Sequence, residues 1–268
     1  MTKKNDFASI NKRFTKTIVE ELTAASQHSA VLVEAPPGAG KSTLTCSVAH
    51  AIATADKSHQ LAVITQTNEQ ADDIVSSLHQ RHPDLKVGRL ISETRGASSA
   101  MRDLASGSRS ITVSDKLDDA SIRSSRIVVA TASKWDYVRQ GHANPDSLFP
   151  IGLIDEAYQM RADLLMNIAC MFEVLLCVGD PGQLDPFAEI DDSIWKGLRY
   201  SPTRSAMSVL QSYHPDLAVH RLPRSWRLPP SAASLVSSAF YPNGSFEAGT
   251  QPGDRKLHFK RPLAGSKG

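Results

Sequence analysis

Short apolar runs alternate with longer amphipathic stretches along most of the chain. Six runs consist almost entirely of β-branched and other apolar residues, a pattern typical of strands that are buried on both faces of a parallel sheet. These expected strands are Ala30–Glu34, Leu61–Thr65, Arg126–Ala130, Ile151–Ile154, Val174–Val178 and Leu217–Leu222. The alternation of strands and helices predicts an α/β fold, in which a mostly parallel sheet carries helices on both faces.

Three helices can be placed, two between these strands and one after the last of them. A glycine-rich turn opens the helical run Lys41–Thr54. Thr67-Asn-Glu-Gln70 has the pattern of a capping box and opens a second helix. Pro229-Pro230 begins a third helix that runs to about Phe240, because proline is well tolerated in a first turn. One face of the second helix carries Ala71, Ile74, Val75 and Leu78.

The segment Ser92–Ser125 interrupts the alternation, since it is rich in Ser, Arg, Asp and Gly. We expect an insertion loop or small subdomain on the sheet's edge, partly mobile, within a domain that spans residues 1–250. Residues 251–268, with a possible strand at Lys256–Lys260, would be a tail or the start of a second domain. The arginines of the segment either touch a phosphate backbone or, the interpretation that we favour, belong to a solvated insert. They are Arg95, Arg102, Arg109, Arg123 and Arg126.

Composition adds little to this outline. A chain of 268 residues with 41% hydrophobic residues can bury one large core. A formal net charge of +2 does not by itself indicate a nucleic-acid-binding protein. Cys46, Cys170 and Cys177 lie in apolar runs without a CxxC pair, which suggests reduced core residues. With neither a signal peptide nor an apolar run of about 18 residues, we expect a cytoplasmic protein that does not contact membranes.

The strongest chemical signal is the segment Ala35-Pro-Pro-Gly-Ala-Gly-Lys-Ser42, which follows a strand and opens a helix. This is the context of a P-loop, whose backbone N–H groups surround phosphates at a helix N-terminus. Lys41 would pair with the β- and γ-phosphates of ATP, and Ser42 would hold Mg²⁺. The predicted nucleotide-binding residues are Pro36, Pro37, Gly38, Ala39, Gly40, Lys41, Ser42 and Thr43.

Two further strand ends carry polar side chains toward the same edge of the sheet. Asp155-Glu156-Ala157 follows the run Ile151–Ile154, so Asp155 would position Mg²⁺ and Glu156 would take a proton from the attacking water. Gly179–Pro186 follows the next strand, and the amide of Gln183 suits a group that contacts the γ-phosphate. Taken alone, this second segment would be explained as well by a plain turn with an exposed glutamine.

A later segment, Leu222-Pro-Arg-Ser-Trp-Arg-Leu-Pro-Pro230, carries two arginines around Trp226. An arginine that faces the γ-phosphate would stabilise the charge of the transition state. We expect Trp226 to be a packing residue rather than one that stacks on a base.

Taken together, these segments resemble the superfamily 1 helicases, in particular the branch whose second motif reads DEAxQ. APPGAGKS resembles motif I, DEAYQ motif II, GDPGQLDP motif III and LPRSWRLPP the start of motif IV, while ITQTNEQADDI and VVATAS resemble motifs Ia and Ic. The resemblance implies a RecA-like ATPase domain in which Arg227 contacts the γ-phosphate. It also implies that a strand of DNA or RNA touches Thr67, Asn68, Thr131 and Ser133.

Motifs V and VI of that family, which belong to a second RecA-like domain, are absent from the sequence. We therefore expect a chain that binds Mg-ATP, hydrolyses it slowly and does not unwind duplexes alone, unless a second RecA-like domain or subunit completes the site. An alternative is an ATP-binding regulatory or partner-binding P-loop module without helicase activity.

Overall fold

The computed structural model describes residues 3–254, except residues 26–28, 94–95, 143–144, 147, 187–192, 196–197, 199–200, 202 and 243. The expected strand Lys256–Lys260 and Arg95 lie outside this part of the chain. The helices are α1 (Lys3–Ala24), α2 (Lys41–Ala55), α3 (Asn68–Arg81), α4 (Ser99–Gly107), α5 (Ala120–Arg123), α6 (Ala132–Gly141), α7 (Ala162–Ile168), α8 (Ala206–Tyr213) and α9 (Pro230–Phe240). The strands are β1 (Ser29–Glu34), β2 (Leu61–Thr65), β3 (Val87–Leu90), β4 (Ile111–Ser114), β5 (Ile127–Thr131), β6 (Phe149–Ile154), β7 (Phe172–Gly179), β8 (Val219–Arg221), β9 (Arg224–Ser225) and β10 (Glu247–Ala248).

The main sheet is parallel throughout the described residues, with strand order β4-β3-β5-β2-β6-β7-β1-β8. The six strands expected from apolar runs are all present in it, so the predicted α/β fold is confirmed. In this order β1, which leads into the phosphate loop, lies beside β7, and β7 lies beside β6. Because all of the strands run in one direction, their carboxyl ends bring three predicted motifs to one edge.

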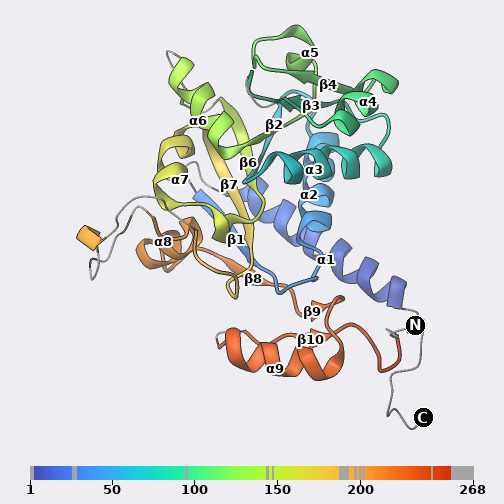
Figure 1. Ribbon diagram of the computed structural model, residues 1–268, viewed down its shortest axis with the longest axis vertical. Helices are drawn as coiled ribbons and strands as arrows, with labels where there is room; N and C mark the ends of the chain where they lie inside the picture. Colours follow the sequence, from blue (N-terminus) through green and yellow to red (C-terminus); the bar gives the residue numbers. More distant parts are fainter. Residues whose placement is uncertain are drawn as a thin grey trace, which may run out of the picture.

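Helices cover both faces of the sheet (Figure 1). On one face α1, α2, α3 and α4 bury a core that includes Ile18, Leu44 and Ile74. On the other face α5, α6, α7 and α8 enclose Trp135 and Met207. The α2 and α3 helices follow the predicted pattern, including the capping box at Thr67. Two-sided burial explains why the central strands carry almost no polar residues.

Of the two expectations for the segment 92–125, an insertion loop or a small subdomain on the sheet's edge, the structure favours the second. It contains α4, β4 and α5, and β4 pairs with β3 as the edge strand of the main sheet. The apolar side chains that anchor it, Met101, Ile111 and Ile122, are few but fully buried. Arg123 forms an ion pair with Asp118, which fits the solvated interpretation of the arginines. Arg126, another of the five arginines, donates hydrogen bonds to carbonyl groups at the end of α2.

The last described part of the chain forms a small unit at one end of the molecule (Figure 1). There β9 and β10 pair in parallel, and α9 packs on a small apolar cluster of Ala233, Tyr241 and Phe246. Pro230 is the first residue of α9, as the proline pair predicts. Within the residues that the structure describes, no helix is long and apolar enough to span a membrane.

Candidate functional site

The phosphate loop connects β1 to α2 in a conformation that requires glycine at two positions. Gly38 and Gly40 have φ angles of 71° and 98°, which residues with a Cβ atom rarely adopt. Close packing adds a second reason. A Cβ atom on Gly38 would lie 2.2 Å from the Cβ of Arg227, and one on Gly40 would lie 2.8 Å from the ring of Phe7.

Lys41, the first residue of α2, lies between two carboxylates from neighbouring strand ends. Its Nζ is 3.5 Å from Oε1 of Glu156 and 3.5 Å from Oδ2 of Asp180. Lys41 is 9% exposed and Asp180 is fully buried. Two negative groups therefore hold this ammonium group at the point where α2 begins.

The carboxylate of Asp155 accepts hydrogen bonds from two hydroxyl groups of α2. Ser42 Oγ lies 3.2 Å from Oδ2, and Thr45 Oγ1 lies 3.3 Å from Oδ1. Burial raises the pKa of Asp155, and these hydrogen bonds together with the charge of Lys41 partly oppose that rise. A buried carboxylate beside a serine hydroxyl, without a direct ion pair in the described residues, offers oxygen ligands that suit a hard cation.

Glu156 follows in an unusual backbone conformation. Its φ of 54° makes it the one described residue other than glycine with a positive φ. Its Oε2 atom is buried and has no hydrogen-bond partner among the described residues. Burial raises the pKa of Glu156, Lys41 lowers it and Asp155 raises it further. Strained backbone and an unsatisfied oxygen are found together most often at functional sites.

Sequence reasoning missed two residues of this cluster, Asp180 and Tyr241. The hydroxyl of Tyr241 donates to Oδ1 of Asp180, and the backbone N–H of Gly182 donates to the same oxygen over 3.1 Å. Burial raises the pKa of Tyr241, so it remains a donor. Asp180 could have been noticed, since it directly follows β7. Tyr241 reaches the site only through the tertiary fold.

Gln183 lies in the turn after β7, where its Oε1 accepts a 2.7 Å hydrogen bond from Nε2 of Gln159. This contact joins the segments DEAYQ and GDPGQLDP. Gln183 therefore lies beside the segment that follows β6, and its contact with the γ-phosphate stays a prediction.

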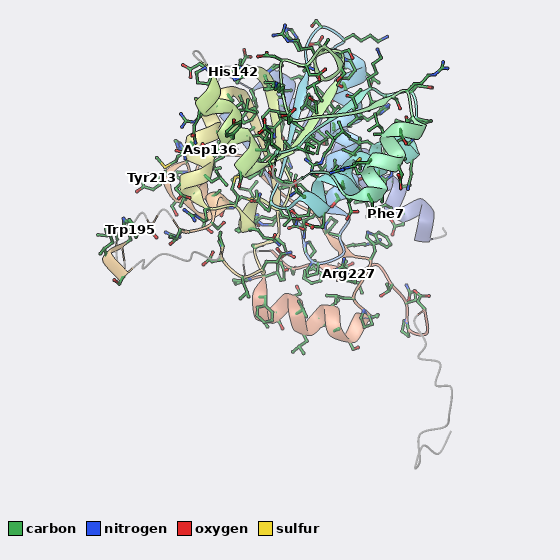
Figure 2. The ribbon with its side chains drawn as sticks, turned by 45° about the horizontal axis from the view of Figure 1, so that its top comes forward. Phe7, Asp136, His142, Trp195, Tyr213 and Arg227 are labelled. Carbon is green, nitrogen blue, oxygen red and sulfur yellow. The ribbon has the colours of Figure 1, made fainter. Side chains whose placement is uncertain are left out.

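The segment that carries Arg227 packs directly on the phosphate loop. Ser225 Oγ donates to the carbonyl of Pro37, and the N–H of Trp226 donates to the carbonyl of Gly38 over 3.0 Å. Arg227 lies between the sheet and α9 with an exposed side chain (Figure 2). Trp226 packs edge-on against Phe7, which agrees with the packing role expected from the sequence.

The remaining predicted nucleotide-binding residues complete the same loop. Ala39 donates its N–H to the carbonyl of Pro36, which closes the turn. Thr43 Oγ1 accepts a 3.2 Å hydrogen bond from Arg81 of α3. The loop is thus fixed by contacts with α3 and with the segment before α9.

A second polar region lies at the same sheet edge, beyond β2 and β5. Here a groove of about 780 Å³ is lined by residues from the starts of α3 and α6 and from the loops after β3 and β4. Four of its lining residues are those predicted to touch a nucleic-acid strand, Thr67, Asn68, Thr131 and Ser133. We call this feature the α3–α6 groove.

Two of these side chains also have structural roles. Thr67 and Thr131 are the N-cap residues of α3 and α6, and their hydroxyl oxygens accept from the backbone N–H groups of Gln70 and Lys134. The hydroxyl of Thr67 also hydrogen-bonds the carboxylate of Glu69. The hydroxyl of Thr131 keeps its hydrogen for another partner.

Asn68 is oriented by a buried arginine that the sequence analysis missed. Arg89 of β3, fully buried, donates to Oδ1 of Asn68 over 2.9 Å and to Oδ1 of Asp72 over 2.9 Å. Since a guanidinium group only donates, the atom of Asn68 that faces it must be the oxygen. The amide nitrogen of Asn68 is left to donate to another partner.

Comparison with known proteins identifies the family. The family described as the AAA domain matches residues 18–189, more than half of the chain. The chain belongs to this family. No curated protein matches the sequence of this AAA domain.

Solved structures resemble this AAA domain with low sequence identity. The nuclease-deletion mutant of the Type ISP restriction-modification enzyme LlaGI, in complex with a DNA substrate mimic, has a TM-score of 0.52 at 11% identity over 80% of this chain and 17% of that chain. The PRRSV helicase has a TM-score of 0.47 at 14% identity, and the arterivirus nonstructural protein 10 helicase has 0.48 at 14%. The chain covers 40% and 42% of those two proteins, and they cover 91% and 85% of it. The similarity to LlaGI supports the fold alone, a RecA-like parallel sheet with helices on both faces.

Proposed function

We propose that this AAA domain binds Mg-ATP and hydrolyses it as the first half of a helicase-like, nucleic-acid-dependent motor. One observation carries the proposal. At the start of α2, Lys41 forms ion pairs with Glu156 and Asp180 from two strand ends, and the next residue, Ser42, donates a hydrogen bond to Asp155. Charges of both signs concentrated in a buried position are typical of phosphoryl-transfer sites rather than of structural ion pairs.

Each residue has a distinct role in this proposal. Lys41 exchanges its carboxylate partners for the β- and γ-phosphates. Glu156 accepts a proton from the attacking water through its unpaired Oε2, and Gln183 orients that water against the γ-phosphate. Arg227, which is exposed beside Gly38, neutralises charge that develops on the γ-phosphate.

The residues present also fit a magnesium ion. Ser42 and Asp155 would hold it, because the serine hydroxyl and the carboxylate oxygen lie 3.2 Å apart and are both hard oxygen ligands. Magnesium supplies neutralisation of phosphate charge when it is bound.

The α3–α6 groove is proposed as the contact for a single strand of DNA or RNA. Its support is that residues from two separate motifs, at Thr67 and Thr131, line one depression. Both residues open helices, and the hydroxyl of Thr131 has a hydrogen to donate, which suits a contact to a sugar-phosphate backbone.

The test measures ATP binding and turnover by the purified chain, with and without Mg²⁺ and a single-stranded oligonucleotide. We expect Mg²⁺-dependent ATP binding and a slow turnover that rises when the strand is added. Lys41→Ala should reduce turnover at least roughly 100-fold, because it removes a cation aimed at the transferred phosphate. Lys16→Ala is the matched control, since Lys16 lies on the exposed side of α1 and pairs with Glu20.

ATP binding that needs neither Mg²⁺ nor Lys41 would contradict the proposed site. Binding that meets both requirements while the strand leaves turnover unchanged would instead favour the regulatory module.

A further inference from the structure

The α3–α6 groove is not a basic channel. Its charged lining residues are Glu69, Glu93 and Asp115 against Lys116 and Lys134, three carboxylates and two ammonium groups. Phosphate groups in the centre of such a groove would gain little from electrostatics. A strand that lies in it must be held mainly by contacts other than ion pairs.

Tyr137 is the aromatic residue that the groove offers for such a contact. It lies on α6 and is 68% exposed, so its ring is accessible from the groove. An exposed aromatic ring at the wall of a polar groove is the kind of group on which nucleobases stack, whatever their sequence.

A buried lysine holds the ring of Tyr137 in place. Lys134 precedes Tyr137 by one helical turn, so that both side chains lie on the same face of α6. The Nζ of Lys134 lies 4.8 Å from the centre of the ring and donates a 2.7 Å hydrogen bond to the carbonyl of Asp115. Lys134 is only 6% exposed, so the cation covers the inner face of the ring and leaves the outer face open. The ring is therefore ordered before any ligand arrives, which reduces the entropy lost on binding.

We propose that Tyr137 stacks on a nucleobase of a single strand bound in the α3–α6 groove, with Lys134 fixing the ring. This rests on the proposed function, since it assumes that the groove takes a nucleic-acid strand. It adds that the bases, and not only the backbone, face the protein there. Asn68, whose outward amide nitrogen is set by Arg89, lines the same groove and can donate to the strand beside the stacked base.

The experiment compares two fluorescent oligonucleotides of equal length, one with thymine bases and one whose central sugars are abasic. Both have the same phosphate backbone. We expect Tyr137→Ala to weaken binding of the base-bearing strand by roughly 5- to 150-fold, the range of one lost stacking contact. Binding of the abasic strand should change less than about twofold. Tyr137→Trp should restore the affinity for the base-bearing strand. Tyr213→Ala is the matched control, because Tyr213 is a half-exposed aromatic at the end of α8 and does not line the groove.

Equal losses on the two strands, or no loss on either, would overturn the stacking role while leaving strand binding intact. Failure of the unmodified chain to bind either strand would overturn the proposed nucleic-acid function and this inference together. The two failures are thus distinguished by the unmodified chain alone. A loss on both strands that Tyr137→Trp does not repair would also count against stacking, since it would indicate a distorted α6.

Discussion

The phosphate-loop site and the α3–α6 groove lie at the same edge of one parallel sheet, yet they are built in different ways. At the phosphate loop the functional side chains are buried and contact one another, as Lys41 does with Glu156 and Asp180. In the groove several side chains, such as Thr67 and Tyr137, are exposed, and buried residues support the lining, as Arg89 supports Asn68. The first arrangement suits the proposed chemistry on a bound phosphate, and the second suits the proposed contact with a strand.

The two regions also depend on different halves of the sheet. The contacts of the phosphate loop depend on β1, β6 and β7 lying side by side. The groove depends on the other half of the sheet, where β5 lies between β2 and β3. Changes at one region should therefore leave the other intact, and the following predictions test that independence from the largest expected effect to the smallest.

The largest effect is expected for Glu156→Gln. The substitution keeps the size of the side chain but removes the proton acceptor, so single-turnover hydrolysis of ATP should fall by roughly 10²- to 10⁴-fold. ATP binding should be retained or become tighter, because Lys41 loses a competing carboxylate. Rapid-quench measurements of hydrolysis and equilibrium titration with ATP check the two expectations.

The same variant tests the independence of the two regions. Its affinity for a single strand in the absence of nucleotide should equal that of the unmodified chain within about twofold. A parallel loss of ATP binding would mean that Glu156 acts in folding of the loop rather than as a base.

The next effect is expected for Arg89→Met, which removes a buried cation from Asp72 and Asn68. Breaking a buried ion pair from one side costs about 3 kcal/mol or more of unfolding free energy, because the partner is left uncompensated. The side chain of Asp72 is 12% exposed, so we expect a value near the lower limit. Urea denaturation followed by circular dichroism measures the change.

The double variant Arg89→Met with Asp72→Leu separates stability from binding. Replacing both partners by apolar residues should recover at least about 1 kcal/mol of the loss. Strand affinity should not recover, because Asn68 has still lost its anchor. A double variant as unstable as the single one would show that the cost arises from packing around β3 and not from the ion pair.

These residues also show where prediction from the sequence stops. The six strands expected from apolar runs exist because burial on both faces leaves a local signature. Strands β3 and β4 lack it: β3 reads Val-Gly-Arg-Leu, and its arginine is buried only because Asp72, 17 residues away, is placed beside it by the fold. A local pattern cannot contain that pairing, so neither strand was predicted, and the segment after β3 was expected only as an insertion loop or a small subdomain on the sheet's edge.

The same limit applies to the candidate site, where residues with a local sequence signal were predicted and residues placed by the tertiary fold were not. Lys41, Asp155 and Glu156 were predicted because each stands at a strand end or in a loop whose geometry is local. Tyr241 donates to Asp180 from the end of α9, and the local sequence around it does not predict a contact with a residue 61 positions earlier. Its place follows from how the last described segment packs across the strand ends.

The smallest effect is expected at Thr131, and it tests whether this residue of the groove serves as a helix cap or as a contact for a strand. Thr131→Ala removes the N-cap of α6, whose hydrogen bond from Lys134 N–H is 3.3 Å long, and should cost about 0.5–1 kcal/mol of unfolding free energy. Thr131→Asn should stay within about 0.3 kcal/mol of the unmodified chain, because asparagine is an equally good cap. Denaturant midpoints at equal m-values measure both.

The two variants then separate capping from binding in the groove. If Thr131 donates its hydroxyl hydrogen to a strand, Thr131→Asn should lower strand affinity although it preserves stability, since the amide presents a different donor at a different position. If strand affinity follows stability in both variants, the hydroxyl serves only as a cap, and the contact comes from the backbone and from Ser133. In that case the groove, unlike the phosphate loop, would recognise its partner mainly through the shape of two helix N-termini and the ring of Tyr137.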